Sequence, residues 1–293
     1  RQAVARNQHL SAQRTQYRTA VKSVRKAILA GKVIDCTGDG DIFASAGCAY
    51  EKEYSGDDRS YNVSVVFRLG NVDSEEFRNW KYDPNSHYRD KLAEYKKLFG
   101  YRISPFVTPM KDIMWVNNFV EGKDCCNVQD LTDTEMLIRR SLNEGIEWIR
   151  ENVPGFKNAF LHDTAPQLGT RGSRRLNGTY RLTMDDIAQT IEHEDTIAII
   201  PAHRRMKYKS PIELPYGVML PADDVEDLLA AGRCFSSAHD ANDHANLIPH
   251  CVALGEAAGA AAALALQSNT TFRDVDVKKV QQMLKKQGVY LPR

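Results

Sequence analysis

The stretch VIDCTGDGDIFASAG, residues 33–47, constrains the fold of this chain more than any other. Its apolar start follows Gly31 and predicts a buried strand, which ends in the turn TGDGD, residues 37–41, before a helix of small residues. Glycines at such a turn let the backbone approach a ligand closely, and the first N–H groups of the following helix attract polar acceptors. The alternative to a ligand-binding turn is a tight turn whose acidic side chains are simply solvated. A calcium site does not fit, because the later positions of an EF-hand loop are wrong.

A second strand with the same kind of ending occurs late in the chain. VEDLLAAGRC, residues 225–234, predicts a buried strand that stops at Gly232, and a polar loop then leads to CVALGEAAGAAAALAL, residues 251–266. The small face around Gly255 and Gly259 allows close contact with a sheet or a flat ligand. The run is shorter than the ~20 apolar residues of a membrane span and an acid interrupts it, so we predict a buried helix and no membrane span.

Three histidines, His239, His244 and His250, crowd the polar loop before this Ala-rich helix. Histidine is the usual acid–base group near neutral pH, so one of them, His239 first, is a candidate proton partner or substrate contact. The alternative is that the three histidines are close together in the sequence by chance and have no catalytic role. No metal site is predicted, because no carboxylate–His or Cys–His spacing defines a coordination geometry.

The segment GTRGSRRLNGTYRLTMDD, residues 169–186, places Arg171, Arg174 and Arg175 among glycines. Guanidinium groups bind carboxylates or phosphates through two parallel hydrogen bonds, so the segment is a candidate substrate site. Structural ion pairs, for instance with the two acids at the end of the segment, are the alternative. The residues alone favour neither interpretation.

Strand and helix patterns mix along the rest of the chain, which predicts an α/β or α+β fold. Residues 61–72 alternate like a strand of a sheet. The segment of residues 130–156 carries the apolar stripe of a long helix, with Asp130 or Thr132 as its N-cap and Pro154-Gly155 as its stop. Thr183 is the expected cap of a shorter helix, and an amphipathic helix closes the chain.

The net charge of +1 creates no field that would attract nucleic acid or an anionic membrane, so neither is an expected partner. Six cysteines are present, and none has a C-x-x-C or zinc-binding spacing. We therefore expect free thiols in a reducing compartment and predict a cytoplasmic protein. Residues 1–34 contain eight Lys and Arg and no acid. Because these are scattered, an ordinary segment is favoured over a basic arm for an acidic partner.

Six segments, in this order, resemble the FAD-dependent oxidoreductases of the glutathione-reductase-like superfamily. They are VIDCTGDGDIFASAG, DLTDTE, PGF, GTRGSRRLNGTYRLTMDD, AGRCFSSAH and ALGEAAGAAAALA. The resemblance implies an α/β fold with a discontinuous FAD-binding domain and an inserted α+β substrate domain. Residues 1–50 and 201–293 would belong to the FAD-binding domain, and residues 51–200 would form the substrate or cap domain.

The resemblance implies FAD as the cofactor and assigns roles to residues of the two glycine-ended segments. In such proteins the turn after the first of these strands lies near FAD, and the AGR and LGEAAG segments close the flavin site. A helix N-terminus near the flavin would stabilise the negative charge of the reduced ring. The implied cofactor-binding residues are Thr37, Gly38, Asp39, Gly232, Arg233, Leu254, Gly255, Glu256, Ala257 and Gly259.

The implied reaction is hydride transfer between a small polar organic substrate and flavin N5. Arg171 and Arg174 would position the substrate, and His239 would be the proton partner. The alternative is a non-catalytic or electron-relay flavoprotein subunit of a larger complex. A third interpretation is an α/β domain that has lost its cofactor.

The sequence departs from the family pattern in two places. The Rossmann fingerprint G-x-G-x-x-G is missing, as is the acid that holds the adenosine ribose, and residues 1–27 have no βαβ pattern. We expect this half of the site from a segment outside the given sequence or from a second chain; otherwise the cofactor is not held. In the histidine loop Asn246 stands near the place where relatives often carry Arg, so the substrate is expected to differ.

Overall fold

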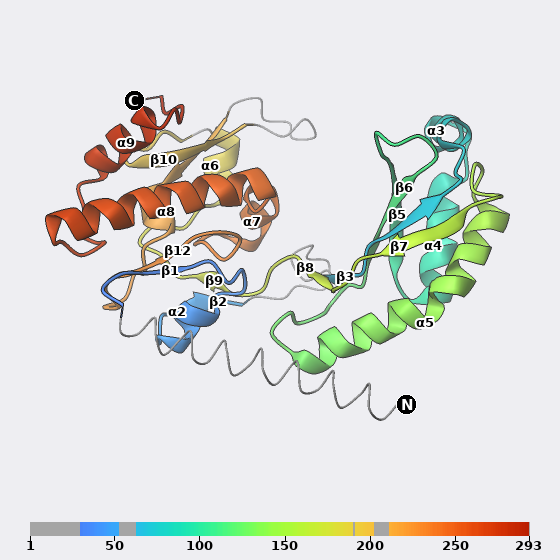
Figure 1. Cartoon of the computed structure of the whole chain (residues 1–293), viewed down its shortest axis with the longest axis horizontal. Helices are drawn as coiled ribbons and strands as arrows, with labels where there is room; N and C mark the ends of the chain where they lie inside the picture. Colours follow the sequence, from blue (N-terminus) through green and yellow to red (C-terminus); the bar gives the residue numbers. More distant parts are fainter. Residues whose placement is uncertain (1–29, 53–62, 190, 202–210, 293) are drawn as a thin grey trace. The chain divides into compact units, whose positions relative to one another are not determined.

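The computed structural model describes most of the chain, namely residues 30–52, 63–189, 191–201 and 211–292 (Figure 1). The chain divides into two compact units, which are described separately here. Unit 1 combines residues 1–52 with residues 174–293, and unit 2 contains residues 53–173. Both units mix helices and strands, in agreement with the expected α/β class. Most of the basic segment near the N-terminus lies outside the described residues.

The second boundary of the units differs from the one expected at residue 200. Residues 174–200 belong to unit 1. One reason is that β9 (Arg175–Leu176) pairs antiparallel with β2 (Tyr50–Glu51). Another is that β10 (Thr196–Ile200) pairs antiparallel with β11 (Ile212–Pro215). The pairing of β2 with β9 joins residues far apart in the sequence, which local patterns do not reveal, whereas β10 and β11 are close in sequence.

The two strands predicted to end in glycine turns are neighbours in unit 1. β1 (Val33–Asp35) pairs in parallel with β12 (Leu228–Ala230), and Asp35 lies opposite Ala230. The carboxyl ends of both strands therefore meet at one edge, where open parallel sheets commonly bind ligands. α2 (Asp41–Ser45) follows β1 directly, as predicted.

The Ala-rich helix α8 (Ile248–Ser268) lies at the centre of unit 1. It packs against α9 (Val277–Lys286) and β10, and Figure 1 shows it stretched across the unit. Leu254, Ala257 and Ala261 are fully buried in the hydrophobic core, whereas Val252 and Leu266 are exposed, so the prediction of a buried helix is confirmed for one face of α8 only. Among the described residues, α8 alone is long and apolar enough to cross a membrane, a test that buried core helices also pass.

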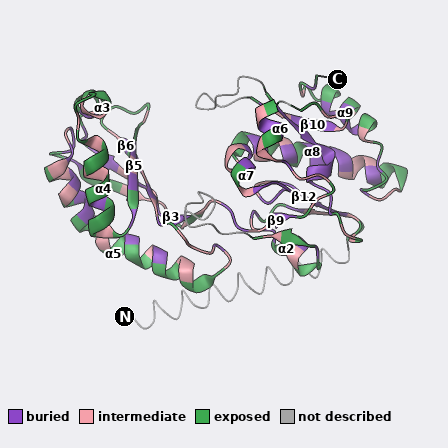
Figure 2. Ribbon diagram, turned by 180° about the vertical axis from the view of Figure 1, so that it is seen from behind, coloured by how far each residue is buried: buried purple, intermediate pink, exposed green. Residues whose placement is uncertain are grey.

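Unit 2 is built on an antiparallel sheet with helices packed against one of its faces. Its strands, in the order β5-β6-β4-β7, are β5 (Arg102–Val107), β6 (Met114–Phe119), β4 (Phe67–Gly70) and β7 (Phe160–Thr164). The packed helices are α3 (Ser74–Tyr82), α4 (Tyr88–Phe99) and α5 (Val128–Asn152). A small pair, β3 (Val63–Ser64) with β8 (Gly169–Thr170), completes the unit. Figure 2 shows α4 and α5 with both buried and exposed residues, as expected for amphipathic helices.

The longest helix, α5, confirms the predicted helix but begins earlier. Its N-cap is Asn127, whose side chain accepts a hydrogen bond from the backbone N–H of Gln129 at 2.9 Å. The predicted caps, Asp130 and Thr132, are wrong, because both residues lie inside the helix. The predicted apolar stripe faces the core of unit 2, with Ile149 fully buried.

The turn that follows α5 gives a test of the packing in unit 2. Gly155 has a φ of 88°, and a Cβ there would overlap the backbone oxygen of Asp73. Gly155→Ala should lower the free energy of unfolding by about 3 kcal/mol, because left-handed strain and a backbone clash add.

The matched control is Gly100, which has a φ of 79° but has only Leu137 Cδ2, at 3.8 Å, near a built Cβ. Gly100→Ala should therefore cost only about 1 kcal/mol. Urea unfolding followed by circular dichroism measures both losses. Equal losses for the two variants would contradict the packing described.

Candidate functional site

The buried carboxylate of Asp35 organises the edge at which β1 and β12 end. Its Oδ1 accepts hydrogen bonds from the backbone N–H of Thr37 at 2.9 Å and from the Thr37 hydroxyl at 2.7 Å. Its Oδ2 accepts from the N–H groups of Ile42 at 3.0 Å and Phe43 at 2.9 Å. One carboxylate thus fixes both the start of the TGDGD turn and the first turn of α2, through charge-assisted hydrogen bonds.

The two glycines of this turn are required by what packs against them. Gly38 and Gly40 have φ values of 83° and 68°, a region in which other residues are strained. A Cβ on Gly38 would lie 2.5 Å from Nη1 of Arg233, and one on Gly40 would overlap the ring of Phe43. Phe43 itself belongs to a small buried cluster beneath the turn.

Two arginines from distant parts of the chain hold Asp39 in this turn. Arg233 Nη2 lies 3.0 Å from Asp39 Oδ2. Arg174 Nη1 donates to the backbone oxygen of Asp39 at 3.0 Å and to Asp41 Oδ1 at 2.8 Å. The backbone oxygen of Arg233 in turn accepts from the buried side-chain amide of Asn242 at 3.0 Å. The turn is therefore braced from both segments of unit 1.

The second glycine turn and one side of α8 border open space. Gly232 has a φ of 112°, and a Cβ there would meet no heavy atom within 4 Å. The same openness is found at Gly255 and Gly259.

No side chain caps the N-terminus of α8, which follows Leu247. Pro249 has no N–H, and the N–H groups of His250 and Cys251 donate to the backbone oxygen of Leu247 at 2.9 and 3.0 Å. This end of α8 therefore offers the positive end of a helix dipole and not a set of unbonded N–H groups.

Comparison with known families identifies the class of protein that has this arrangement. A family model described as FAD dependent oxidoreductase matches residues 2–284. The chain belongs to the FAD dependent oxidoreductase family. Searches of curated proteins and of solved structures found no match. The family identifies the protein as an oxidoreductase with FAD as its cofactor, which confirms the resemblance drawn from the sequence.

The residues of this FAD dependent oxidoreductase fit the flavin part of the cofactor. The open backbone at Gly232 offers a flat contact, and the N-terminus of α8 offers the positive end of a helix dipole. The TGDGD turn follows β1 at the same edge of the sheet at which the Gly232 turn follows β12. The fingerprint that binds the pyrophosphate is absent from the sequence, so these residues account for the flavin part alone.

The remaining residues predicted to bind the cofactor are divided between core and surface. Leu254 and Ala257 are fully buried in the core, which leaves only their backbone for a ligand. Gly255 and Gly259 are exposed. Glu256 lines a separate cavity of about 220 Å³ between α8, β10 and the C-terminal residues.

The three predicted catalytic residues belong to different parts of the oxidoreductase. His239 is the first residue of α7 (His239–Ala245) and is half-buried in unit 1. Arg174 also lies in unit 1, on the TGDGD turn, whereas Arg171 follows β8 in unit 2. Arg174 therefore has a structural partner in the cofactor turn that the sequence did not indicate.

The third arginine of that segment fits the alternative interpretation of structural contacts. Arg175 is buried, and its Nε donates to the backbone oxygen of Ser237 at 3.0 Å. Its Nη2 lies 3.8 Å from Glu51, which also accepts two hydrogen bonds from Arg181 at 2.7 and 2.8 Å. The acid that holds these arginines is thus Glu51, which is distant in sequence.

Sequence reasoning missed two important residues, Asp35 and Asn242. Asp35 was given no role of its own in the sequence analysis, although the D-x-T spacing to Thr37 is a signal for an Asx turn. Asn242 carries no comparable signal. Its bond to Arg233 is visible only when α7 is packed in place.

The thiols near the turn are held in their neutral form. All six cysteines are free. Burial, and then the charge of Asp35, raise the pKa of Cys36, while burial and Asp223 raise the pKa of Cys48 to about 11. Burial also raises the pKa of Cys234. Neutral thiols are poor nucleophiles, so thiol chemistry does not suit this edge.

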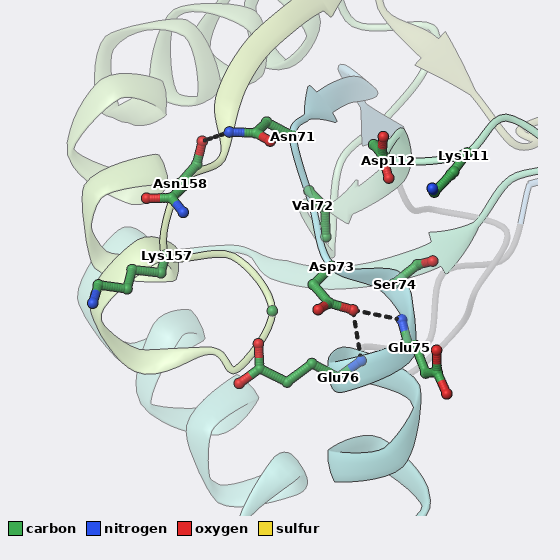
Figure 3. Close-up of a pocket in the computed structure, with 11 residues that line it drawn as sticks. Asn71, Val72, Asp73, Ser74, Glu75, Glu76, Lys111, Asp112, Lys157 and Asn158 are labelled. Atoms are coloured by element: carbon green, nitrogen blue, oxygen red, sulfur yellow. Dashed lines mark hydrogen bonds between the residues drawn. The ribbon is translucent and has the colours of Figure 1, made fainter.

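Two other kinds of site were considered, a metal site and a surface hollow in unit 2, and neither contains the predicted site residues. Within the part of the chain that the structure describes, no three His, Cys, Asp or Glu side chains could hold a metal ion. The hollow, of about 560 Å³, lies at the start of α3 (Figure 3). There the Asp73 carboxylate caps α3 by accepting from the N–H groups of Glu75 and Glu76 at 3.1 and 2.9 Å. None of the predicted site residues lines it.

The bracing role of Asp35 can be tested by removing its charge. Asp35→Asn replaces one acceptor oxygen by a donor that faces backbone N–H groups, so the free energy of unfolding should fall by about 2–4 kcal/mol. Asp41→Asn is the control, because the Asp41 side chain is 64% exposed and its ion pair contributes about 0–1 kcal/mol. Urea denaturation measures both, and an equal, small loss in the two variants would contradict the role of Asp35.

Proposed function

We propose that this FAD dependent oxidoreductase transfers a hydride between a small polar organic substrate and flavin N5. The proposal rests on the edge at which the parallel strands β1 and β12 end in two glycine turns. Ligands of open α/β sheets bind at such carboxyl ends, where backbone N–H groups and helix N-termini point outward. FAD, when bound, supplies the hydride-accepting atom of the reaction.

The backbone of Thr37, Gly38 and Asp39 would hold one edge of the flavin, and Gly232 with Arg233 would hold another. This arrangement is supported by the φ values of the glycines and by the open space beside Gly232. The positive N-terminal end of α8 would stabilise negative charge that develops on the bound ring. The ion pair between Arg233 and Asp39 keeps the first turn rigid while this happens.

His239 in unit 1 and Arg171 in unit 2 are proposed separately, each for one role toward the substrate. His239, at the start of α7, would take the proton that the substrate loses when its hydride leaves. Arg171 would hold a polar group of the substrate through charge-assisted hydrogen bonds. Arg174 would act indirectly, since it bonds the Asp39 backbone oxygen and Asp41.

We also propose that a further segment or a second chain binds the ADP part of FAD. The absence of G-x-G-x-x-G from the given sequence supports this proposal. Six free thiols support a reducing compartment, and we propose a cytoplasmic location on that basis.

The acid–base role of His239 has a direct kinetic test. Purified protein, with every polypeptide that accompanies it, is mixed without oxygen with a panel of alcohols, amines, sugars and hydroxy acids. The rate at which the flavin loses its absorbance is then recorded. For a donor that works, His239→Ala should slow this step about 100-fold, because general base catalysis contributes on that scale.

The control for this test is His87→Ala, since the His87 side chain is 82% exposed on unit 2 and lies outside the proposed site. Circular dichroism should show both variants folded. Wild-type rates in His239→Ala would contradict the proposed role. Flavin that is bleached only when a partner protein is added would favour the electron-relay alternative instead.

A further inference from the structure

One buried side-chain amide joins three segments of unit 1. It belongs to Asn242 on α7, which is 1% exposed. Its Nδ2 donates two hydrogen bonds, to the backbone oxygen of Arg233 at 3.0 Å and to the hydroxyl of Ser237 at 2.9 Å. Its Oδ1 accepts one from the side-chain amide of Asn246 at 2.9 Å. Both N–H donors of this amide are therefore used inside the protein, on two different segments.

The bond to Arg233 holds the glycine turn that follows β12. Gly232 in this turn has a φ of 112°, and a left-handed backbone is stable only where its surroundings hold it. The side chain of Arg233 reaches Asp39, with Nη2 at 3.0 Å from Oδ2. Asn242 thus holds the backbone of the residue whose side chain holds the TGDGD turn.

The bond to Ser237 holds the backbone directly before His239. Ser237 is 1% exposed, and its backbone oxygen accepts from Nε of the buried Arg175 at 3.0 Å. The next residue, Ala238, donates its N–H to the backbone oxygen of Leu182 at 2.7 Å. His239 therefore begins α7 on a backbone that is bonded from β9, from the loop before α6 and from α7 itself.

We propose that Asn242 is a positioning residue, which sets His239 at a fixed place relative to the turn at Gly232. The inference rests on the function proposed above, in which that turn holds the flavin and His239 takes a proton. A reacting group displaced by about 1 Å can cost about 100-fold in rate, so a rigid link between the two has a clear use.

A neutral amide suits this role better than other buried side chains. It has two donors and one acceptor in fixed directions, and it adds no charge beside the turn. An apolar side chain of similar size would leave the Arg233 carbonyl and the Ser237 hydroxyl without this donor, and buried polar groups without partners are costly.

A purely structural amide in unit 2 provides the comparison. Asn118 is fully buried, its Oδ1 accepts from the N–H of Val65 at 2.8 Å, and its Nδ2 donates to the oxygen of the same residue at 2.6 Å. Both bonds go to one residue, so Asn118 joins only two segments and lies outside the proposed site. Asn118→Ala is therefore the matched control for Asn242→Ala.

The first measurement is the dissociation constant of FAD. Equilibrium dialysis uses the whole purified protein with every polypeptide that accompanies it. Asn242→Ala should weaken FAD binding about tenfold, because the Gly232 turn loses an anchor. Asn118→Ala should lower the midpoint of urea unfolding and bind FAD as wild type does. Equal FAD affinity in Asn242→Ala and wild type would overturn the inference, and this measurement needs no electron donor.

The second measurement is the limiting rate of flavin reduction by a donor from the panel described above. Asn242→Ala should slow it about tenfold or more, while the apparent dissociation constant of the donor changes less than about twofold. In a His239→Ala background the same change should slow it less than about twofold, because the residue through which it acts is gone. Equal slowing in both backgrounds shows a merely structural role and overturns the inference.

A further variant separates the two bonds and serves if Asn242→Ala does not fold. Ser237→Ala removes only the bond to the start of α7, so it should slow reduction and leave FAD affinity unchanged. Wild-type rates in Ser237→Ala would then overturn the inference. Wild-type rates in His239→Ala would contradict the proposed function itself, whereas a slow His239→Ala beside an unaffected Asn242→Ala overturns this inference alone.

Discussion

The edge at which we propose that FAD binds to this oxidoreductase depends on one buried carboxylate. Asp35 accepts four hydrogen bonds, from the backbone and hydroxyl of Thr37 and from the N–H groups of Ile42 and Phe43. Without these bonds the left-handed turn at Gly38 and Gly40 would lose its anchor, and a left-handed backbone is stable only where its surroundings hold it. The left-handed backbone of this turn is therefore held by the hydrogen-bond network below it.

Residues from both segments of unit 1 complete this network, and that links the fold to its function. β12 supplies the second strand and the Gly232 turn, and Arg233 then reaches back to Asp39. Arg174 reaches the same turn from residues that follow unit 2 in sequence. The site is thus assembled only when segments on both sides of unit 2 have packed. Closing so long an intervening segment costs little more entropy than closing a short one.

The sequence revealed those parts of the fold whose signals are local. Glycine after an apolar run located β1 and β12. Thr183 was identified as the cap of α6 (Met184–Gln189), where its hydroxyl oxygen accepts from the backbone N–H of Asp186 at 3.4 Å. The predicted caps of α5 were wrong, because its N-cap is a side chain outside the periodic stretch. The second unit boundary lies before the expected residue 200, because β9 pairs with the distant strand β2. For the same reason the sequence could identify Gly232 as a candidate for the site but could not show that Arg174 braces Asp39.

The most direct measurement of the central claim is the flavin content of purified protein that carries one changed glycine. Wild type should show flavin bands near roughly 370 and 450 nm, and intact-mass analysis identifies every chain present. Gly232→Val should lose the flavin, because its side chain would fill the open space at the turn and strain a φ of 112°. Gly288→Val, with a φ of 94° and equally open surroundings at the end of α9, should keep it. Equal flavin content in the two variants, or a colourless wild type, would contradict the account.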